Sequence, residues 1–127
     1  MKPVLADSSA VLAYLRQEPA GEVVRHRLAG VVLSTVNLAE VVAVLTRRGV
    51  GPACIDTQFL AVFDRHLPFD AALAVVSGRL ITTTAAAGLS LGDRACLATA
   101  AHHRLPVLTA DRAWASLDIG VEIEVIR

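Results

Sequence analysis

Four acidic residues, far apart in the chain, occupy local sequences of similar kinds: Asp7, Glu40, Asp93 and Asp111. The first and the last follow short apolar runs, 4–6 and 105–108, which predict buried strands. The other two lie in the first two turns of predicted helices. Carboxylates gathered from these four places would repel one another unless they took up protons or bound a cation. The chemistry that these residue types suggest is therefore that of a divalent metal ion.

Repulsion within such a cluster is large enough to require a partner. Two carboxylates about 5 Å apart at an effective dielectric of about 20 repel by roughly 3 kcal/mol. Oxygen ligands without an accompanying set of cysteines and histidines favour Mg²⁺ or Mn²⁺ over zinc. One or two such ions allow hydrolysis of a phosphodiester without a lysine or a histidine. The sequence predicts this chemistry if the four acids meet.

Three apolar runs, each followed by a helical pattern, predict the elements that would bring the acids together: 4–6, 31–33 and 105–108. The strand–helix–strand order implies a parallel sheet with right-handed crossovers, in which the carboxyl ends of the strands share one edge. Asp7 and Asp111 would lie at that edge. The helices that carry Glu40 and Asp93 would begin there, so their first turns would stay close to it.

The remaining sequence predicts three more helices: 21–28, 52–66 and 70–87. The segment 67–69 is expected at most as a short edge strand, because proline cannot donate to a central ladder. Strict alternation over 121–126 predicts a closing strand. We therefore expect one α/β domain over residues 1–127, with a central, mostly parallel sheet of four to five strands.

Each acid also has a purely structural explanation when it is considered alone. Asp7 and Asp111 could simply cap the helical turns that follow them. The segments 37–40 and 90–93 each match a capping box that ends in an acid. Gly92 needs a different explanation, because glycine in a first helical turn lowers helix propensity and suits close approach of the backbone to a ligand or another chain.

Charge excludes several classes of protein. Lysine and arginine number 12, as do aspartate and glutamate, so no net charge draws the chain toward nucleic acid or anionic lipid. A polyanion would have to be held locally or through bound cations. Lys2 is the sole lysine, which excludes P-loop, haloacid-dehalogenase phosphatase and response-regulator receiver sites, since each of them needs an interior lysine.

Cysteine usage and hydropathy indicate the compartment and the need for a partner. Cys54 and Cys96 match no metal or redox spacing, so we expect reduced thiols in a cytoplasmic protein. The sequence shows neither a signal peptide nor an apolar stretch that could span a membrane. Hydrophobic residues make up 54% of the chain, which predicts an apolar surface that is covered by a partner or a second copy.

The combination of an early aspartate, a helical glutamate, a Gly-Asp pair on a helix and a Thr-x-Asp after a strand resembles the PIN-domain ribonucleases. The resemblance is specifically to the VapC-type toxins of VapBC toxin–antitoxin systems and runs nearly from end to end. It implies a three-layer α/β/α fold and metal-dependent endoribonuclease activity on structured or single-stranded RNA. It also implies a homodimer, or a heteromer with a cognate VapB-type antitoxin whose tail enters the acidic groove.

The resemblance also implies roles for individual residues. It implies four catalytic and metal-binding acids, of which the last often acts through water: Asp7, Glu40, Asp93 and Asp111. The hydroxyls of Ser8 and Thr109 are implied to lie near the metal ions or the scissile phosphate and to bind substrate. The helical segment 52–66 is implied to form a surface for dimer or antitoxin contact.

Two other functions fit the same residues. A catalytically silent module of the same fold would use the acidic groove only to receive a peptide or RNA. A metal-dependent nuclease or phosphatase of similar α/β form would act on DNA or on a phosphate ester instead of RNA. Divalent-ion-dependent assays with RNA, single-stranded DNA and a generic phosphate ester distinguish these functions.

Overall fold

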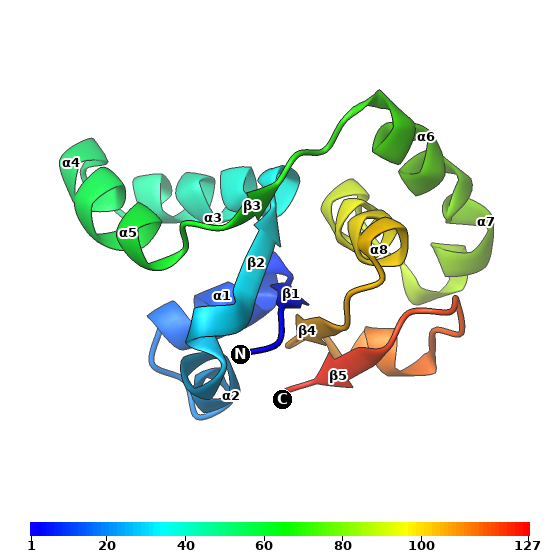
Figure 1. Ribbon diagram of the computed structural model, residues 1–127, viewed down its shortest axis with the longest axis horizontal. Helices are drawn as coiled ribbons and strands as arrows, with labels where there is room; N and C mark the ends of the chain where they lie inside the picture. Colours follow the sequence, from blue (N-terminus) through cyan, green and yellow to red (C-terminus); the bar gives the residue numbers. More distant parts are fainter.

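A computed structural model describes residues 1–127 and shows a five-stranded sheet between two layers of helices (Figure 1). The strands are β1 (Val4–Ala6), β2 (Val31–Ser34), β3 (His66–Leu67), β4 (Val107–Thr109) and β5 (Ile123–Val125). They lie in the order β3-β2-β1-β4-β5, and every neighbouring pair is parallel. The predicted fold class, a three-layer α/β/α domain with a parallel sheet, is therefore confirmed.

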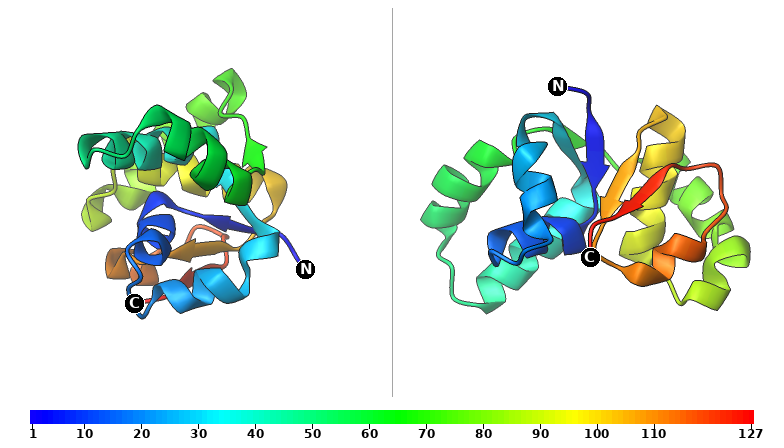
Figure 2. Two further views of the ribbon diagram at one scale, coloured as in Figure 1. Left: turned by 90° about the vertical axis from the view of Figure 1, so that its left-hand side faces the viewer. Right: turned by 90° about the horizontal axis from the view of Figure 1, so that it is seen from below.

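The helices form two groups on opposite sides of the sheet, as the right-hand view of Figure 2 shows. One group contains α1 (Ser8–Leu15), α2 (Gly21–His26), α3 (Thr35–Arg47), α4 (Pro52–Cys54) and α5 (Leu60–Val62). The other contains α6 (Ala71–Arg79), α7 (Ile81–Thr84) and α8 (Leu91–His103). A π-helical segment, Ile55–Phe59, joins α4 to α5, and short 3-10 turns cover Leu28–Gly30, Ala85–Ala87 and Arg112–Ser116. None of these helices combines the length and the hydropathy that a bilayer crossing requires.

Alternating side chains of the strands fill two separate cores. In β1, Val4 and Ala6 pack with the group that contains α1 and α3, whereas Leu5 packs with α8 and Trp114 on the other side. Buried parallel strands have both faces covered, which is why their sequences are continuously apolar rather than alternating. The sheet is thus held from both sides, and its carboxyl edge has a fixed position.

The register of the two central strands places their carboxyl ends together. Ala6 pairs with Leu108, and the Asp7 backbone N–H donates to the Leu108 carbonyl at 3.0 Å. Asp7 and Thr109 therefore leave the sheet side by side, although they are far apart in the sequence. This is the edge at which ligands bind in open α/β sheets.

Several predicted boundaries shift for local reasons. The strand expected over 105–108 is observed as β4 at Val107–Thr109, because Pro106 has no N–H to donate. The strand expected over 121–126 pairs only over Ile123–Val125. The helix expected over 70–87 is divided into α6, α7 and a 3-10 turn, and it ends at Gly88 with φ +68°, as a glycine stop does.

One predicted motif is wrong. The segment 37–40 is not a capping box, because α3 begins two residues earlier and Ser34 caps it by accepting from the Val36 N–H at 3.2 Å. Asn37 lies inside the helix, and its side-chain amide donates to Glu40. The capping box over 90–93 is confirmed at the start of α8.

Candidate active site

Asp7 is the buried acid of the site. It follows β1 directly and caps α1, with Oδ1 accepting from the Ala10 N–H at 2.9 Å and from the Ser9 hydroxyl at 2.7 Å. Its Oδ2 accepts from the Thr109 hydroxyl at 2.7 Å. Only 2% of the residue is exposed. The capping explanation is thus correct, and it is compatible with a functional role, because the same carboxylate also connects α1 to β4.

The environment of Asp7 disfavours its charge. Burial raises the pKa of Asp7 from 3.8 to about 6. Hydrogen bonds from Ser9, Ala10 and Thr109 act in the opposite direction, and the charge of Asp93 raises the pKa further. A buried carboxylate that lacks a cationic partner is what a metal ion would stabilise, since the ion supplies the missing opposite charge.

Glu40 lies on the first turns of α3 and points across to α8. Its Oε1 accepts from the Ser8 hydroxyl at 2.9 Å and from the Asn37 side-chain amide at 2.8 Å. A Cβ built on Gly92 would overlap the Glu40 carboxylate. The glycine in the first turn of α8 is therefore explained by the close approach of the Glu40 side chain, rather than by a ligand or another chain.

Asp93 stands in the first turn of α8, half-buried, and belongs to a complete capping box. Its Oδ2 accepts from the Ser90 N–H at 2.9 Å, and its own N–H donates to the Ser90 hydroxyl at 3.2 Å. Asp93 is also close enough to Asp7 for its charge to raise the pKa of that residue. Its carboxylate lies at the N-terminal end of α8, where the helix dipole interacts favourably with a negative charge.

Cys96 shows that three of the acids converge. This thiol is fully buried on α8, and burial raises its pKa well above the ordinary value. The charges of Asp7, Asp93 and Glu40 raise it further. Asp7 after β1, Glu40 on α3 and Asp93 on α8 therefore lie near enough for their charges to act on the same buried side chain. The cysteine itself is a core residue, as the sequence indicates, and it stays protonated in this environment.

Asp111 is the outermost of the four acids. It is exposed, and its Oδ1 accepts from the Ala113 N–H at 2.9 Å, so it caps the 3-10 turn that follows β4. Its own N–H donates to the Thr109 hydroxyl at 3.1 Å, and that hydroxyl donates to Asp7. The structure links Asp111 to Asp7 through Thr109, and no direct contact joins the two carboxylates.

The residues present suit a hard divalent cation in their chemistry. The donor set consists of oxygens alone, and the buried Asp7 has no cationic partner. As the side chains stand, however, no three acidic, histidine or cysteine side chains are close enough to hold one metal ion together. Each carboxylate is instead occupied by hydrogen-bond donors of its own neighbourhood.

Sequence reasoning missed two residues of this site. Ser9 donates to Asp7 and accepts from the Ala110 N–H at 2.9 Å, so it connects α1 to the segment after β4. Asn37 is buried at 1% exposure and contacts both Glu40 and Gly92. A polar residue one helical turn before a site acid was the available signal for Asn37, but a wrong helix start assigned it to a cap.

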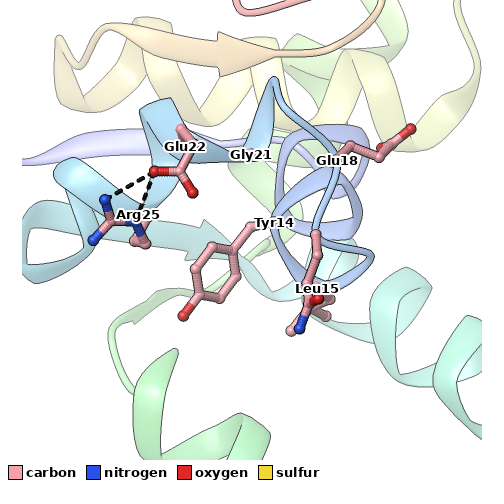
Figure 3. A pocket seen from close by; sticks show the side chains of 7 residues that line it. Tyr14, Leu15, Glu18, Gly21, Glu22 and Arg25 are labelled. Atoms are coloured by element: carbon pink, nitrogen blue, oxygen red, sulfur yellow. Dashed lines mark hydrogen bonds and ion pairs between the residues drawn. The ribbon is translucent and has the colours of Figure 1, made fainter.

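A surface hollow of the chain lies away from the acids. It measures about 460 Å³, lies between α1 and α2, and is lined by residues that include Tyr14, Glu18 and Glu22 (Figure 3). Glu22 is paired with Arg25 at 2.8 Å, and none of the four acids faces this hollow. The volume of a pocket therefore does not mark the chemistry of this protein; the convergence of charge at the sheet edge does.

Comparison with solved structures gives the same fold. FitAcB from Neisseria gonorrhoeae is 25% identical, with 97% of each chain covered and a TM-score of 0.73. A member of the VapBC family of toxin–antitoxin systems from Mycobacterium tuberculosis is 26% identical, with 100% of this chain and 99% of that chain covered and a TM-score of 0.62. DNA-bound VapBC from Salmonella typhimurium covers both chains fully at a TM-score of 0.75 and 16% identity, which shows a shared fold only.

Comparison of the sequence itself gives the family. No protein with a curated description matches the chain significantly. The family model of the PIN domain matches residues 4–120, which include the first four strands and all four acids. With the fold, the converging acids and this match in agreement, the chain belongs to the PIN domain family of nucleases.

Proposed function

We propose that this PIN domain is a metal-dependent endoribonuclease and the toxin component of a type II toxin–antitoxin system. The observation that carries the proposal is that Asp7, Glu40 and Asp93 lie at one edge: Ser8, next to Asp7, donates to Glu40 at 2.9 Å, and the Glu40 carboxylate lies against Gly92, next to Asp93. Three carboxylates directed at one place are unfavourable without a cation. The whole chain, residues 1–127, would act as one domain in this role.

The acids would hold Mg²⁺ or Mn²⁺, with Asp7, Glu40 and Asp93 as direct ligands and Asp111 acting through water. When bound, such an ion stabilises the charge that develops during phosphodiester hydrolysis and lowers the pKa of water for in-line attack. Hydroxyl groups of the chain orient two of these carboxylates: Ser8 donates to Glu40 at 2.9 Å, and Thr109 donates to Asp7 at 2.7 Å. Ser8 is half-buried, so its hydroxyl could also reach a scissile phosphate, whereas the buried Thr109 would act through Asp7.

Binding of an ion requires small rearrangements of the acids. Glu40 and Asp93 are half-buried, so rotation of their side chains is sterically cheap compared with movement of Asp7. The bonds to be exchanged are hydrogen bonds to carboxylates, each worth about 1.5–3 kcal/mol net. The gain is an opposite charge beside Asp7, whose pKa is raised mainly by burial and further by the charge of Asp93.

Cleavage assays test the proposal directly. RNA, single-stranded DNA and a phosphate monoester are incubated side by side with the purified chain, with Mg²⁺, with Mn²⁺ or with a chelator. The proposal predicts cleavage of RNA that requires the ion. A preference for DNA or for the monoester would show that RNA is not the substrate. If the folded chain binds the ion and cleaves none of the three substrates, it is a catalytically silent binding module.

A second surface supports an antitoxin partner. An apolar groove of about 280 Å³ lies between α1, α3 and the α4–α5 segment, and nine of its ten lining residues are hydrophobic. Val62 on α5 lines it and is 43% exposed. Such a groove suits the apolar face of an amphipathic helix. The related Mycobacterium tuberculosis structure is of a toxin–antitoxin family, so we assign this groove to a cognate VapB-type antitoxin.

Self-association completes the proposed assembly. A homodimer would cover apolar side chains that lie outside the groove assigned to the antitoxin, among them Val75 and Ile81 on the opposite layer. None of the four acids lines a surface pocket, so the acidic edge is separate from the apolar groove assigned to the antitoxin. Cytoplasmic RNA is the substrate that fits this proposal.

A further inference from the structure

Asn37 occupies an unusual position for a polar side chain. It lies inside α3 at 1% exposure, and its Nδ2 donates to Glu40 Oε1 at 2.8 Å and to the Gly92 carbonyl at 3.3 Å. Its Oδ1 is buried and has no hydrogen-bond partner. A buried acceptor without a donor costs about 1–3 kcal/mol. An apolar side chain of similar volume would avoid that cost.

Chemistry fixes the orientation of this amide. Both neighbours of Nδ2, the Glu40 carboxylate and the Gly92 carbonyl, are acceptors only. If the amide were turned over, Oδ1 would face two acceptors and the NH₂ group would have no acceptor. The unpartnered Oδ1 is therefore the consequence of placing the donor side where Glu40 and Gly92 need it.

The two donors on Glu40 use the same oxygen. Ser8 and Asn37 both donate to Oε1, at 2.9 and 2.8 Å, while Oε2 accepts no hydrogen bond. Oε2 is also the carboxylate oxygen nearest to the position that a Gly92 side chain would occupy. The carboxylate is thus held by one oxygen between α1 and α3, and it presents the other toward the first turn of α8, where Asp93 stands.

We propose that Asn37 is a positioning residue for Glu40: its amide ties the carboxylate to the first turn of α8 and leaves Oε2 available to a divalent cation. The inference rests on the proposed nuclease function and deepens it. Asn37 contacts neither substrate nor cation in this arrangement. It acts through Glu40 as partners in the outer shell of metal sites do, whose loss typically weakens metal binding by about 10- to 100-fold.

The first experiment measures ion binding rather than turnover. Mn²⁺ affinity is measured by calorimetry on the purified chain and on the variants Asn37→Leu and Asn37→Asp. Ser77→Ala is the matched control, because Ser77 is also buried in a helix with an unpartnered oxygen but lies on α6. We expect about 10- to 100-fold weaker Mn²⁺ binding for Asn37→Leu, with its melting temperature retained, and no change for Ser77→Ala. Equal affinity of Asn37→Leu and the unmodified chain would overturn the inference.

The second experiment does not depend on the ion and separates the two proposals. Unfolding free energies of the metal-free chain, Asn37→Leu, Glu40→Gln and the double variant form a double-mutant cycle. Non-additive effects show that Asn37 holds Glu40, and additive effects overturn the inference, even if Asn37→Leu binds Mn²⁺ weakly. Failure of the unmodified chain to bind Mn²⁺ or to cleave RNA would instead overturn the nuclease function, while the cycle still decides the contact.

Discussion

The hydroxyl of Thr109 donates a 2.7 Å hydrogen bond to Asp7 Oδ2, across a separation of 102 residues in the sequence. Parallel pairing of β1 with β4 makes this contact possible, because it brings the carboxyl ends of the two strands together. The same hydroxyl accepts from the Asp111 N–H at 3.1 Å. One side chain thereby fixes the buried acid and the segment that carries the outermost acid. The predictions below follow from how such contacts hold the acidic edge.

The metal-free chain should become less stable as pH rises from about 4 to about 6. Asp7 has a pKa of about 6 when folded and 3.8 as its ordinary value, so the folded state binds more protons in this window. The shift corresponds to about 3 kcal/mol of stability, which is fully present below about pH 4 and fully lost above about pH 6. Denaturant unfolding in chelator, followed by the fluorescence of the single, buried Trp114, measures it.

Asp7→Asn is the control for that measurement. The amide keeps its oxygen as an acceptor for Ala10 and carries no charge, so the pH dependence between 4 and 6 should flatten. At neutral pH the variant should be at least as stable as the unmodified chain, because it no longer buries a charge. Its rate of RNA cleavage should nevertheless fall by at least about 100-fold, as expected where a functional residue is kept at a cost in stability. A variant that is less stable than the unmodified chain at pH 7.5 would contradict the assigned cost of burying Asp7.

Gly92→Ala should inactivate the site without unfolding the helix. A Cβ at this position overlaps the Glu40 carboxylate, and that flexible group must move away. Alanine raises helix propensity by about 1 kcal/mol, so the free energy of unfolding should not fall much. Gly78→Ala on α6 is the matched control, because a Cβ there meets nothing within 4 Å. For Gly92→Ala, the melting temperature should be retained while the rate of RNA cleavage falls. For Gly78→Ala, neither the melting temperature nor the cleavage rate should fall.

Thr109→Val should raise the pKa of Asp7 further. The variant keeps the shape of the side chain but removes a donor that lowers this pKa. The lower limb of the pH–rate profile should move to higher pH, and the unfolding free energy should fall by about 1–3 kcal/mol. Thr99→Val removes a buried hydroxyl that donates only to the Ala95 carbonyl on α8, so its profile should not move. Equal pH–rate profiles for Thr109→Val and Thr99→Val would show that the Thr109 hydroxyl does not affect the active site.

Val62→Asp should weaken antitoxin binding. A charge placed in the apolar groove beside α5 would be desolvated when a helix docks there, at a cost of several kcal/mol. Val75→Asp is the control, since Val75 is similarly exposed on α6. Calorimetry with the product of the adjacent reading frame should show at least about 10-fold weaker binding for Val62→Asp alone. Weaker antitoxin binding by Val75→Asp but not by Val62→Asp would show that the antitoxin binds the layer that contains α6.

The acids and the sheet could be predicted because their signals are local. Buried parallel strands are continuous apolar runs, and Asp7 and Asp111 follow two of them directly, so topology alone brings them to one edge. The early positions of Glu40 and Asp93 in their helices then place both near it. The Gly92 anomaly indicated a close approach, although its partner proved to be Glu40.

The connections among the acids could not be predicted, because they depend on side-chain directions. The sequence predicts a capping box that starts at Asn37, whereas α3 is capped by Ser34, a few residues earlier. That shift changes Asn37 from a cap into a link between Glu40 and Gly92. The sequence also does not show that Ser9, rather than Ser8, contacts Asp7. Adjacent helical positions face different ways, and the rotation of α1 about its axis depends on tertiary packing.

The central claim is that the converging acids act on RNA through a divalent cation. The most direct test is the initial rate of RNA cleavage as a function of Mg²⁺ concentration, for the unmodified chain and for Asp93→Asn purified identically. We predict a rate that saturates with Mg²⁺, vanishes in chelator and falls by at least about 100-fold in the variant, whose circular dichroism and melting curve stay native. Cleavage that persists in chelator, or at an unchanged rate in Asp93→Asn, would contradict the account.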